Sequence, residues 1–247
     1  YEKCMNKDAT TELAAYVESD DSVADNSFTS VNIHSSLDMV TWGKLSPTIS
    51  RRAVPTIKDI NETTGSISLD YEITAFNEDG KTEVYDVTEF YRMRYTENGV
   101  WLLDFNRNAQ QVFDGNLPAV DNEGLAIGVG SRDIQYMSNP SGEIIAFVQQ
   151  GDLWAYHCTA NRFTRIFSFR QTKNGDERDA NHSHDMKIVR MDKSGDMDFV
   201  VYGYFNRGVH EGEVGVGVYR YINDQNLVEE QVFIPSTESY EFLKKDL

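Results

Sequence analysis

The side chains best suited to catalysis or to ligand binding lie in two short stretches, residues 181–185 and 207–211. They are His182, His184, Asp185, Arg207, His210 and Glu211. In an extended segment His182 and His184 point the same way, and imidazole nitrogens are common ligands of zinc and related metals. One hypothesis is therefore a metal or enzymatic site formed by His182, His184 and His210 with Asp185 nearby. The alternative is a solvated polar loop, because two histidines without a defined third ligand are a weak signal.

Other catalytic patterns have less support in this sequence. The acidic run 176–179 lacks the spaced Asp/Asn pattern and downstream Glu of a calcium loop. No G-x-S-x-G motif is present, so no nucleophile elbow is indicated. Carboxylates are abundant, but none is marked as half of an acid/base pair. The sequence favours a non-enzymatic protein that needs no cofactor, with carbohydrate binding through exposed Trp or Tyr as a further alternative.

The charge of the chain limits its partners. Its 247 residues include 40 acidic and 23 basic side chains, which gives a net charge of −17. A protein with this net negative charge repels the phosphate backbone of nucleic acid, so nucleic acid is not an expected partner. No stretch of about 18 apolar residues could span a membrane, so no membrane contact is expected within this segment. A protein partner, or the remainder of a longer chain, is the expected binding partner.

The elements that must position these residues are mainly strands. Residues 1–60 are predicted to form a small α/β segment, with a helix over 8–18 followed by irregular chain. Residues 61–130 form an antiparallel meander, because apolar residues alternate with polar ones from residue 66 onward and turns are marked at 77–80 and 98–99. Residues 131–247 form a third part.

Residues 131–235 show the clearest pattern, two successive units of four short strands separated by tight turns. The Asn-Pro-Ser-Gly turn at 139–142 returns as Asp-Lys-Ser-Gly at 192–195, and each is followed by an apolar strand. Repeats of this length with four strands each are typical of propeller blades. In the second unit, Gly215 and Gly217 leave one face of a strand bare, which predicts close packing of an aromatic or a neighbouring blade.

Antiparallel order also predicts which loops lie together. In both units the loops after strands two and four share one end of the sheet, and the long loops 170–185 and 205–213 belong to this set. Long loops on a rigid scaffold are where binding residues tend to lie. This end, which carries all six candidate residues, is the predicted functional face.

The stretch Ser-Gly-Glu-Ile-Ile-Ala-Phe-Val at 141–148, followed by Gly-Asp-Leu-Trp at 151–154, resembles the blade repeat of TolB-like, or WD40-like, propellers. The resemblance implies a partial β-propeller, with 61–130 as a degenerate blade. More loosely, the whole chain is similar to uncharacterised large extracytoplasmic proteins of anaerobic Gram-positive bacteria. That similarity implies a piece of a larger cell-surface protein, anchored to the membrane through another segment, with a binding or scaffold role.

Overall fold

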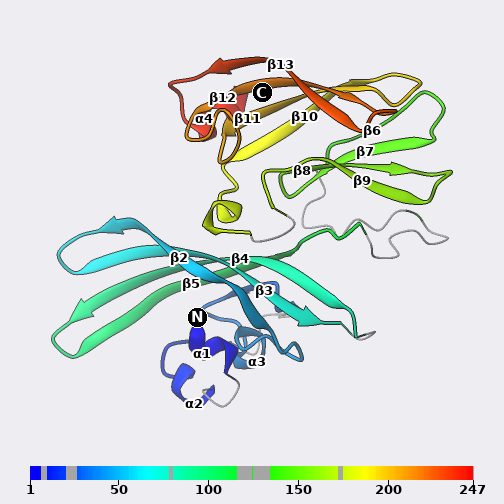
Figure 1. Cartoon of the computed structure of the whole chain (residues 1–247). Helices are drawn as coiled ribbons and strands as arrows, with labels where there is room; N and C mark the ends of the chain where they lie inside the picture. Colours follow the sequence, from blue (N-terminus) through cyan, green and yellow to red (C-terminus); the bar gives the residue numbers. More distant parts are fainter. Residues whose placement is uncertain are drawn as a thin grey trace. The chain divides into compact units, whose positions relative to one another are not determined.

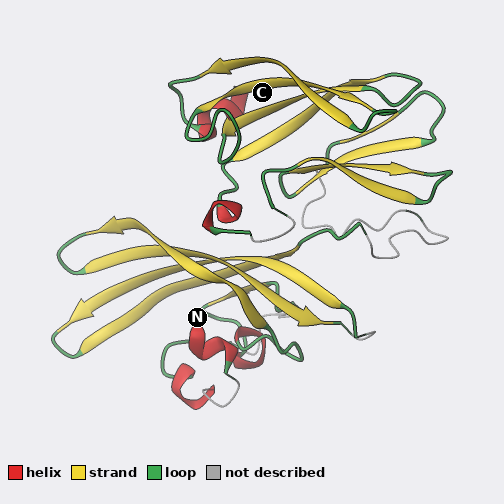
Figure 2. Ribbon diagram, in the orientation of Figure 1, coloured by secondary structure: helices red, strands yellow, loops and turns green. Residues whose placement is uncertain are grey.

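A computed structural model describes residues 1–6, 10–20, 27–77, 80–115, 124, 134–171 and 175–246 (Figure 1). Contacts divide the chain into two compact units, Tyr1–Val112 and Phe113–Leu247. Most of the described residues belong to antiparallel strands, and the helices are short (Figure 2). The expectation of a mainly β protein built from antiparallel sheets is confirmed.

The first unit contains one five-stranded antiparallel sheet with the order β1-β5-β4-β3-β2. Its strands are β1 (Ser30–Asn32), β2 (Thr48–Ile60), β3 (Thr64–Phe76), β4 (Thr82–Thr96) and β5 (Gly99–Gln111). In β3 the buried side chains of Leu69, Tyr71 and Ile73 alternate with half-exposed polar ones. The alternation of residues 66–73 in the sequence therefore identifies the face that carries the core.

The predicted boundary at residue 60 is wrong, because β2 pairs with β3 along its length. The register of that pairing shifts three times, and Pro55 lies within the strand. Bulges and proline are typical of an edge strand that is protected from pairing with other chains. These same features remove the period-two pattern, which explains why residues 48–60 look irregular in the sequence.

Three short helices lie on one side of this sheet (Figures 1 and 2): α1 (Glu2–Met5), α2 (Thr10–Leu13) and α3 (Leu37–Val40). The predicted helix over 8–18 is thus shorter than expected, and its start at residues 8–9 lies outside the described residues. The hydroxyl oxygen of Ser36 caps α3 by accepting a hydrogen bond from the amide of Met39. Beneath the helices, Cys4, Val40 and Phe105 belong to one buried cluster.

The second unit contains the two predicted four-stranded antiparallel sheets. The first consists of β6 (Tyr136–Ser138), β7 (Ile144–Gln149), β8 (Asp152–His157) and β9 (Arg162–Phe167). The second consists of β10 (His184–Met191), β11 (Met197–Tyr204), β12 (Val214–Ile222) and β13 (Leu227–Pro235). Each sheet follows the chain order of its strands, as a propeller blade does, and the sheets are not closed into a barrel.

Hydrogen bonds at equivalent places show that the two sheets repeat one design. The Tyr156 hydroxyl donates to Asn161 Oδ1 at 2.9 Å, and the Tyr221 hydroxyl donates to Asn226 Oδ1 at 3.1 Å. Both asparagines have positive φ, 45° and 49°, a conformation that asparagine tolerates better than most residues. Each pair therefore closes the turn between the third and fourth strands of its sheet in the same way.

The two sheets share one hydrophobic core. Phe167 of the first sheet contacts Phe199 and Tyr219 of the second, with ring centroids 5.8 and 5.1 Å apart. The expected close packing at the glycines of β12 is confirmed. A Cβ atom at Gly215 would lie 2.5 Å from the Phe233 ring, and one at Gly217 would lie 2.6 Å from the Tyr219 ring.

Candidate functional site

The two long loops of the second unit lie together at one end of its sheets, as their place in the strand order predicts. Arg207, in the loop between β11 and β12, connects them. Its Nε donates to the carbonyl oxygen of Phe169 at 2.8 Å, and its Nη2 donates to carboxylate oxygens of Asp176 and Asp179, both at 2.7 Å. The side-chain Nδ2 of Asn206 donates hydrogen bonds to the carbonyl oxygens of Arg178 and Asn181. Hydrogen bonds and ion pairs from Asn206 and Arg207 therefore hold the two loops together.

A second arginine completes this ion-pair network. Arg178, in the short 3-10 helix η2 (Glu177–Ala180), donates from Nη2 to Asp176 at 2.7 Å and from Nη1 to Glu211 at 2.9 Å. The hydrogen bond from the Arg178 side chain is the main cause that keeps the pKa of Asp176 below its ordinary value. Two candidate residues, Arg207 and Glu211, are thus engaged in holding the loops together.

Replacing Arg207 by Gln is expected to lower the free energy of unfolding of the second unit by about 2 kcal/mol. The variant loses hydrogen bonds to two carboxylates, one of which, Asp179, is buried, and a bond to a charged group contributes about 1.5–3 kcal/mol. Urea titration followed by circular dichroism measures the loss. Arg178→Gln, at a more exposed position, should cost less. Equal losses in the two variants would contradict the role given to Arg207.

His184 is buried, and its ring nitrogens form no hydrogen bond with His182 or His210. Its Nε2 lies 3.1 Å from the carbonyl oxygen of Gly151, and its ring meets the Phe169 ring edge to face at 4.8 Å. Burial lowers the pKa of His184 to about 4. The neutral ring donates from Nε2 to Gly151, so His184 has a packing role.

The other two histidines have different surroundings. The His210 ring stacks on Phe233 with centroids 3.7 Å apart, and its Nε2 lies 2.9 Å from Glu230. The Nδ1 of His182 lies 3.5 Å from a guanidinium nitrogen of Arg170. Among the described residues, no three His, Cys, Asp or Glu side chains are close enough to hold one metal ion. The predicted site of three histidines is therefore not formed there.

Asp185 and two exposed aromatic residues, Tyr95 and Trp101, also differ from the predicted sites. Asp185 faces α4 (Tyr240–Asp246), where its carboxylate lies 3.7 Å from Lys244 Nζ. Tyr95 and Trp101 are exposed at the end of the β4–β5 hairpin, but Tyr95 pairs with Val100 and Trp101 with Arg94. Their side chains therefore point to opposite faces of the sheet, and they do not form one stacking platform for a sugar.

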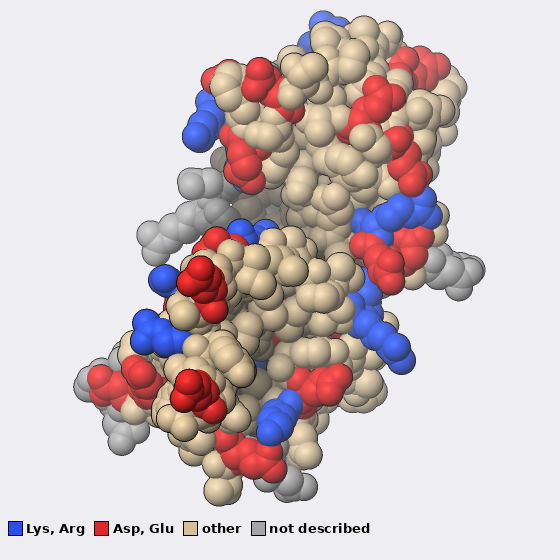
Figure 3. Space-filling view, turned by 90° about the vertical axis from the view of Figure 1, so that its left-hand side faces the viewer, with Lys and Arg blue, Asp and Glu red and all other residues tan. Residues whose placement is uncertain are grey.

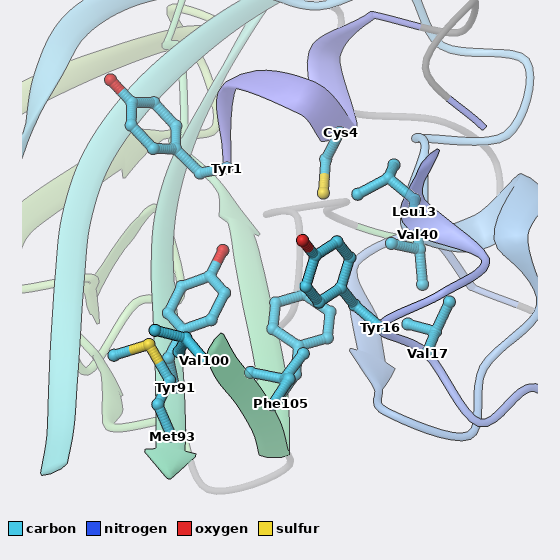
Figure 4. A pocket seen from close by; sticks show the side chains of 11 residues that line it. Tyr1, Cys4, Leu13, Tyr16, Val17, Val40, Tyr91, Met93, Val100 and Phe105 are labelled. Atoms are coloured by element: carbon cyan, nitrogen blue, oxygen red, sulfur yellow. The ribbon is translucent and has the colours of Figure 1, made fainter. Parts of the chain in front are cut away.

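A pocket in the first unit is the site that the sequence did not predict. Its volume is ≈ 190 Å³, and it lies between the inner face of β4–β5 and the N-terminal helices. Figure 4 shows Cys4, Leu13, Val17 and Val40 on one side and Tyr91, Met93 and Phe105 on the other, with their side chains directed toward one another. The lining is almost entirely apolar and aromatic, as expected of a site for an apolar group.

A buried ion pair supports the wall of this pocket. Glu89 and Arg107 are cross-strand neighbours on β4 and β5, and both side chains are fully buried. Arg107 Nε donates to Glu89 Oε1 at 2.8 Å, and its Nη1 donates to the carbonyl oxygen of Val40 at 2.9 Å. The guanidinium also lies 4.0 Å from the ring of Trp42, a favourable cation–π arrangement.

Two tyrosine hydroxyls complete the environment of Glu89. Tyr71 donates to Oε1 at 3.0 Å, and Tyr91, which lines the pocket, donates to Oε2 at 2.5 Å. Burial is the main cause that raises the pKa of both hydroxyls and of the Cys4 thiol. These groups stay protonated at neutral pH, so the pocket offers no activated nucleophile from Cys4 and suits binding better than catalysis.

No protein-family model matches this chain, and no curated protein is similar to it.

Charged side chains of both signs lie on the face that Figure 3 shows, and the expectation that nucleic acid is not a partner stays a prediction. In Figure 3 acidic side chains are distributed over both units, and the basic ones lie among them without forming a continuous basic surface. Among the described residues, no helix is long and apolar enough to cross a membrane. In the described part of the chain, the apolar pocket of the first unit is an arrangement suited to binding.

Proposed function

We propose that this chain is a non-enzymatic binding part of a larger protein, and that the pocket of its first unit receives an apolar group of a protein partner. The observation that carries the proposal is the pocket itself, ≈ 190 Å³ with an apolar lining. An apolar cavity of about 150 Å³ is large enough to bind benzene. A phenyl ring or a branched alkyl group of a partner therefore fits this volume.

The second unit has the role of a scaffold in this proposal. Its loops are closed by ion pairs, and its two sheets share one core. The TolB-like character of its blades belongs to the same proposal, and the four-stranded blade-like sheets support it. The extracytoplasmic, cell-surface location is also part of the proposal and rests on the resemblance of the sequence alone. Further blades from the rest of a longer chain would complete a propeller.

Toluene is a suitable probe, since it has the size of a side-chain anchor and no charge. Titration into the ¹⁵N-labelled chain should give saturable shifts of amide signals from pocket residues such as Val17, Tyr91 and Leu102. At ten times its Kd, toluene should stabilise the first unit by about 1.4 kcal/mol through mass action. Shifts spread over the whole chain, or no saturable shifts, would remove the support for this function.

Val17→Trp tests whether the pocket is the site, because the larger ring fills part of it. This variant should lose at least tenfold in toluene affinity. The same substitution at Val189, which is exposed on β10, provides the matched control and should leave the affinity unchanged.

A further inference from the structure

We infer that the natural occupant of this pocket is an apolar side chain of a peptide segment whose flanking residues are basic. The inference rests on the proposed function and specifies the chemistry of the partner. It depends on three features of the first unit: the apolar surface around the mouth, the engaged polar groups at the wall, and the charge of the segments beside the pocket.

The apolar surface continues from the pocket across the same face of the sheet. Ile57, Ile60, Tyr95 and Val100 are 67%, 73%, 68% and 55% exposed. Tyr95 is the cross-strand neighbour of Val100, which lines the pocket, and direct neighbours in an antiparallel pair share a face.

The register extends this surface to the edge of the sheet. Ile60 pairs with Gly65, which pairs with Met93, and Met93 pairs with Leu102. Met93 and Leu102 both line the pocket, so Ile60 lies on the same face as the pocket. The occupant that covers this surface extends well beyond 190 Å³, as a peptide with an anchor side chain does and a small metabolite does not.

The wall of the pocket selects an apolar anchor. The hydroxyl of Tyr91 is already donated to Glu89, and Glu89 accepts further bonds from Tyr71 and Arg107. Arg107 and Trp42 each have a buried nitrogen without a hydrogen-bond partner, but neither residue lines the pocket. A polar group of the occupant at this wall would lose its bonds to water without regaining them, which costs about 1–3 kcal/mol.

Carboxylates lie beside the helical side of the pocket. Glu2, Glu12 and Glu18 are exposed, and each directly adjoins a lining residue in the sequence, Tyr1, Leu13 or Val17. Lys3 forms an ion pair with Glu12 at 2.5 Å and so offsets one of these charges.

The two arginines beside the pocket on β4 add no positive charge to the face that carries it. Arg92 and Arg94 flank Met93 on β4, and because side chains alternate along a strand they point away from the pocket. Residues 1–112 contain 19 acidic and 10 basic side chains in total. This field attracts a cationic segment and speeds its association, whereas it repels an anionic membrane surface.

Short capped peptides test this chemistry on the full chain. The series is Lys-Lys-Phe-Lys-Lys, its versions with Leu or Ala at the centre, and Glu-Glu-Phe-Glu-Glu, each titrated by NMR at low ionic strength. The Phe and Leu peptides should bind at least tenfold more tightly than the Ala peptide and the acidic peptide. Added salt should weaken the binding, because the charged groups are exposed to solvent.

Two variants locate the binding. Val17→Trp should reduce the affinity for the Phe peptide at least tenfold, and Val189→Trp should not change it. Val100→Lys places a positive charge at the exposed mouth without altering the core, so it should weaken the basic peptides severalfold while toluene still binds. This second variant keeps the test decisive if Val17→Trp fails to fold.

Several results would overturn the inference. If the acidic and basic Phe peptides bind equally, or if Val100→Lys has no effect on the basic one, the charge requirement is absent. If toluene binds in the pocket but none of the peptides does, this inference fails and the proposed function stands. Binding to phosphatidylcholine vesicles that Val17→Trp abolishes, without peptide binding, would assign the surface to lipid instead. If toluene does not bind either, the proposed function fails as well.

Discussion

Glu89→Gln is expected to lower the free energy of unfolding of the first unit by about 3–5 kcal/mol. The substitution removes the negative partner of Arg107, whose guanidinium then stays buried without a compensating charge, and breaking a buried pair in this way has a cost of that size. It also removes the charged acceptor of the Tyr71 and Tyr91 hydroxyls. Trp42 fluorescence during urea unfolding, in a Trp101→Phe, Trp154→Phe background, reports on this unit alone.

Two controls distinguish the cost of leaving a buried charge unpaired from the cost of breaking an ion pair at an exposed position. Glu12→Gln breaks the exposed pair with Lys3 and should change stability little, since exposed pairs contribute little. Glu89→Leu combined with Arg107→Met removes both charges and should recover most of the stability that Glu89→Gln loses. If Glu89→Gln is no more damaging than Glu12→Gln, the buried pair does not support the pocket wall.

The sequence already contained the signal for this pair. Val87, Glu89, Tyr91 and Met93 alternate along β4, so Glu89 occupies an apolar face of the strand. A charged residue in that position needs a buried partner, but only the register of β4 with β5 identifies Arg107. The pocket is less predictable, because its lining comes from residues as far apart as Tyr1 and Phe105. In addition, helices of four residues are too short to show a helical repeat of apolar residues in the sequence.

The second unit was easier to predict, with one instructive exception. Turn residues and apolar runs identify eight strands, and antiparallel order places the two long loops at one end. The sequence alone indicates that His184 is a loop residue that points the same way as His182. It is instead the first residue of β10, where its side chain lies on the same buried face as Met186 and Ile188. Extending the alternation two residues toward the N-terminus would have placed His184 in the core.

The second unit is expected to lose roughly 3 kcal/mol of stability between pH 6.5 and pH 4 through His184 alone. Burial lowers the pKa of His184 to about 4, below its ordinary value of 6.5. In this range the unfolded chain binds a proton at this residue and the folded unit does not, so acid favours unfolding. The contribution is fully present above pH 6.5 and is lost as the pH falls toward 4, at about 1.4 kcal/mol per pH unit.

His184→Gln isolates this contribution, because its side chain does not titrate and its amide can still donate to the carbonyl oxygen of Gly151. Urea unfolding of both proteins, followed by Trp154 fluorescence between pH 4 and pH 8, gives the difference in stability at each pH. Burial also lowers the pKa of His157, but that histidine is present in both proteins and cancels in the difference. A difference in stability that does not vary with pH would contradict the prediction, because it would show that the pKa of His184 is the same in the folded and unfolded protein.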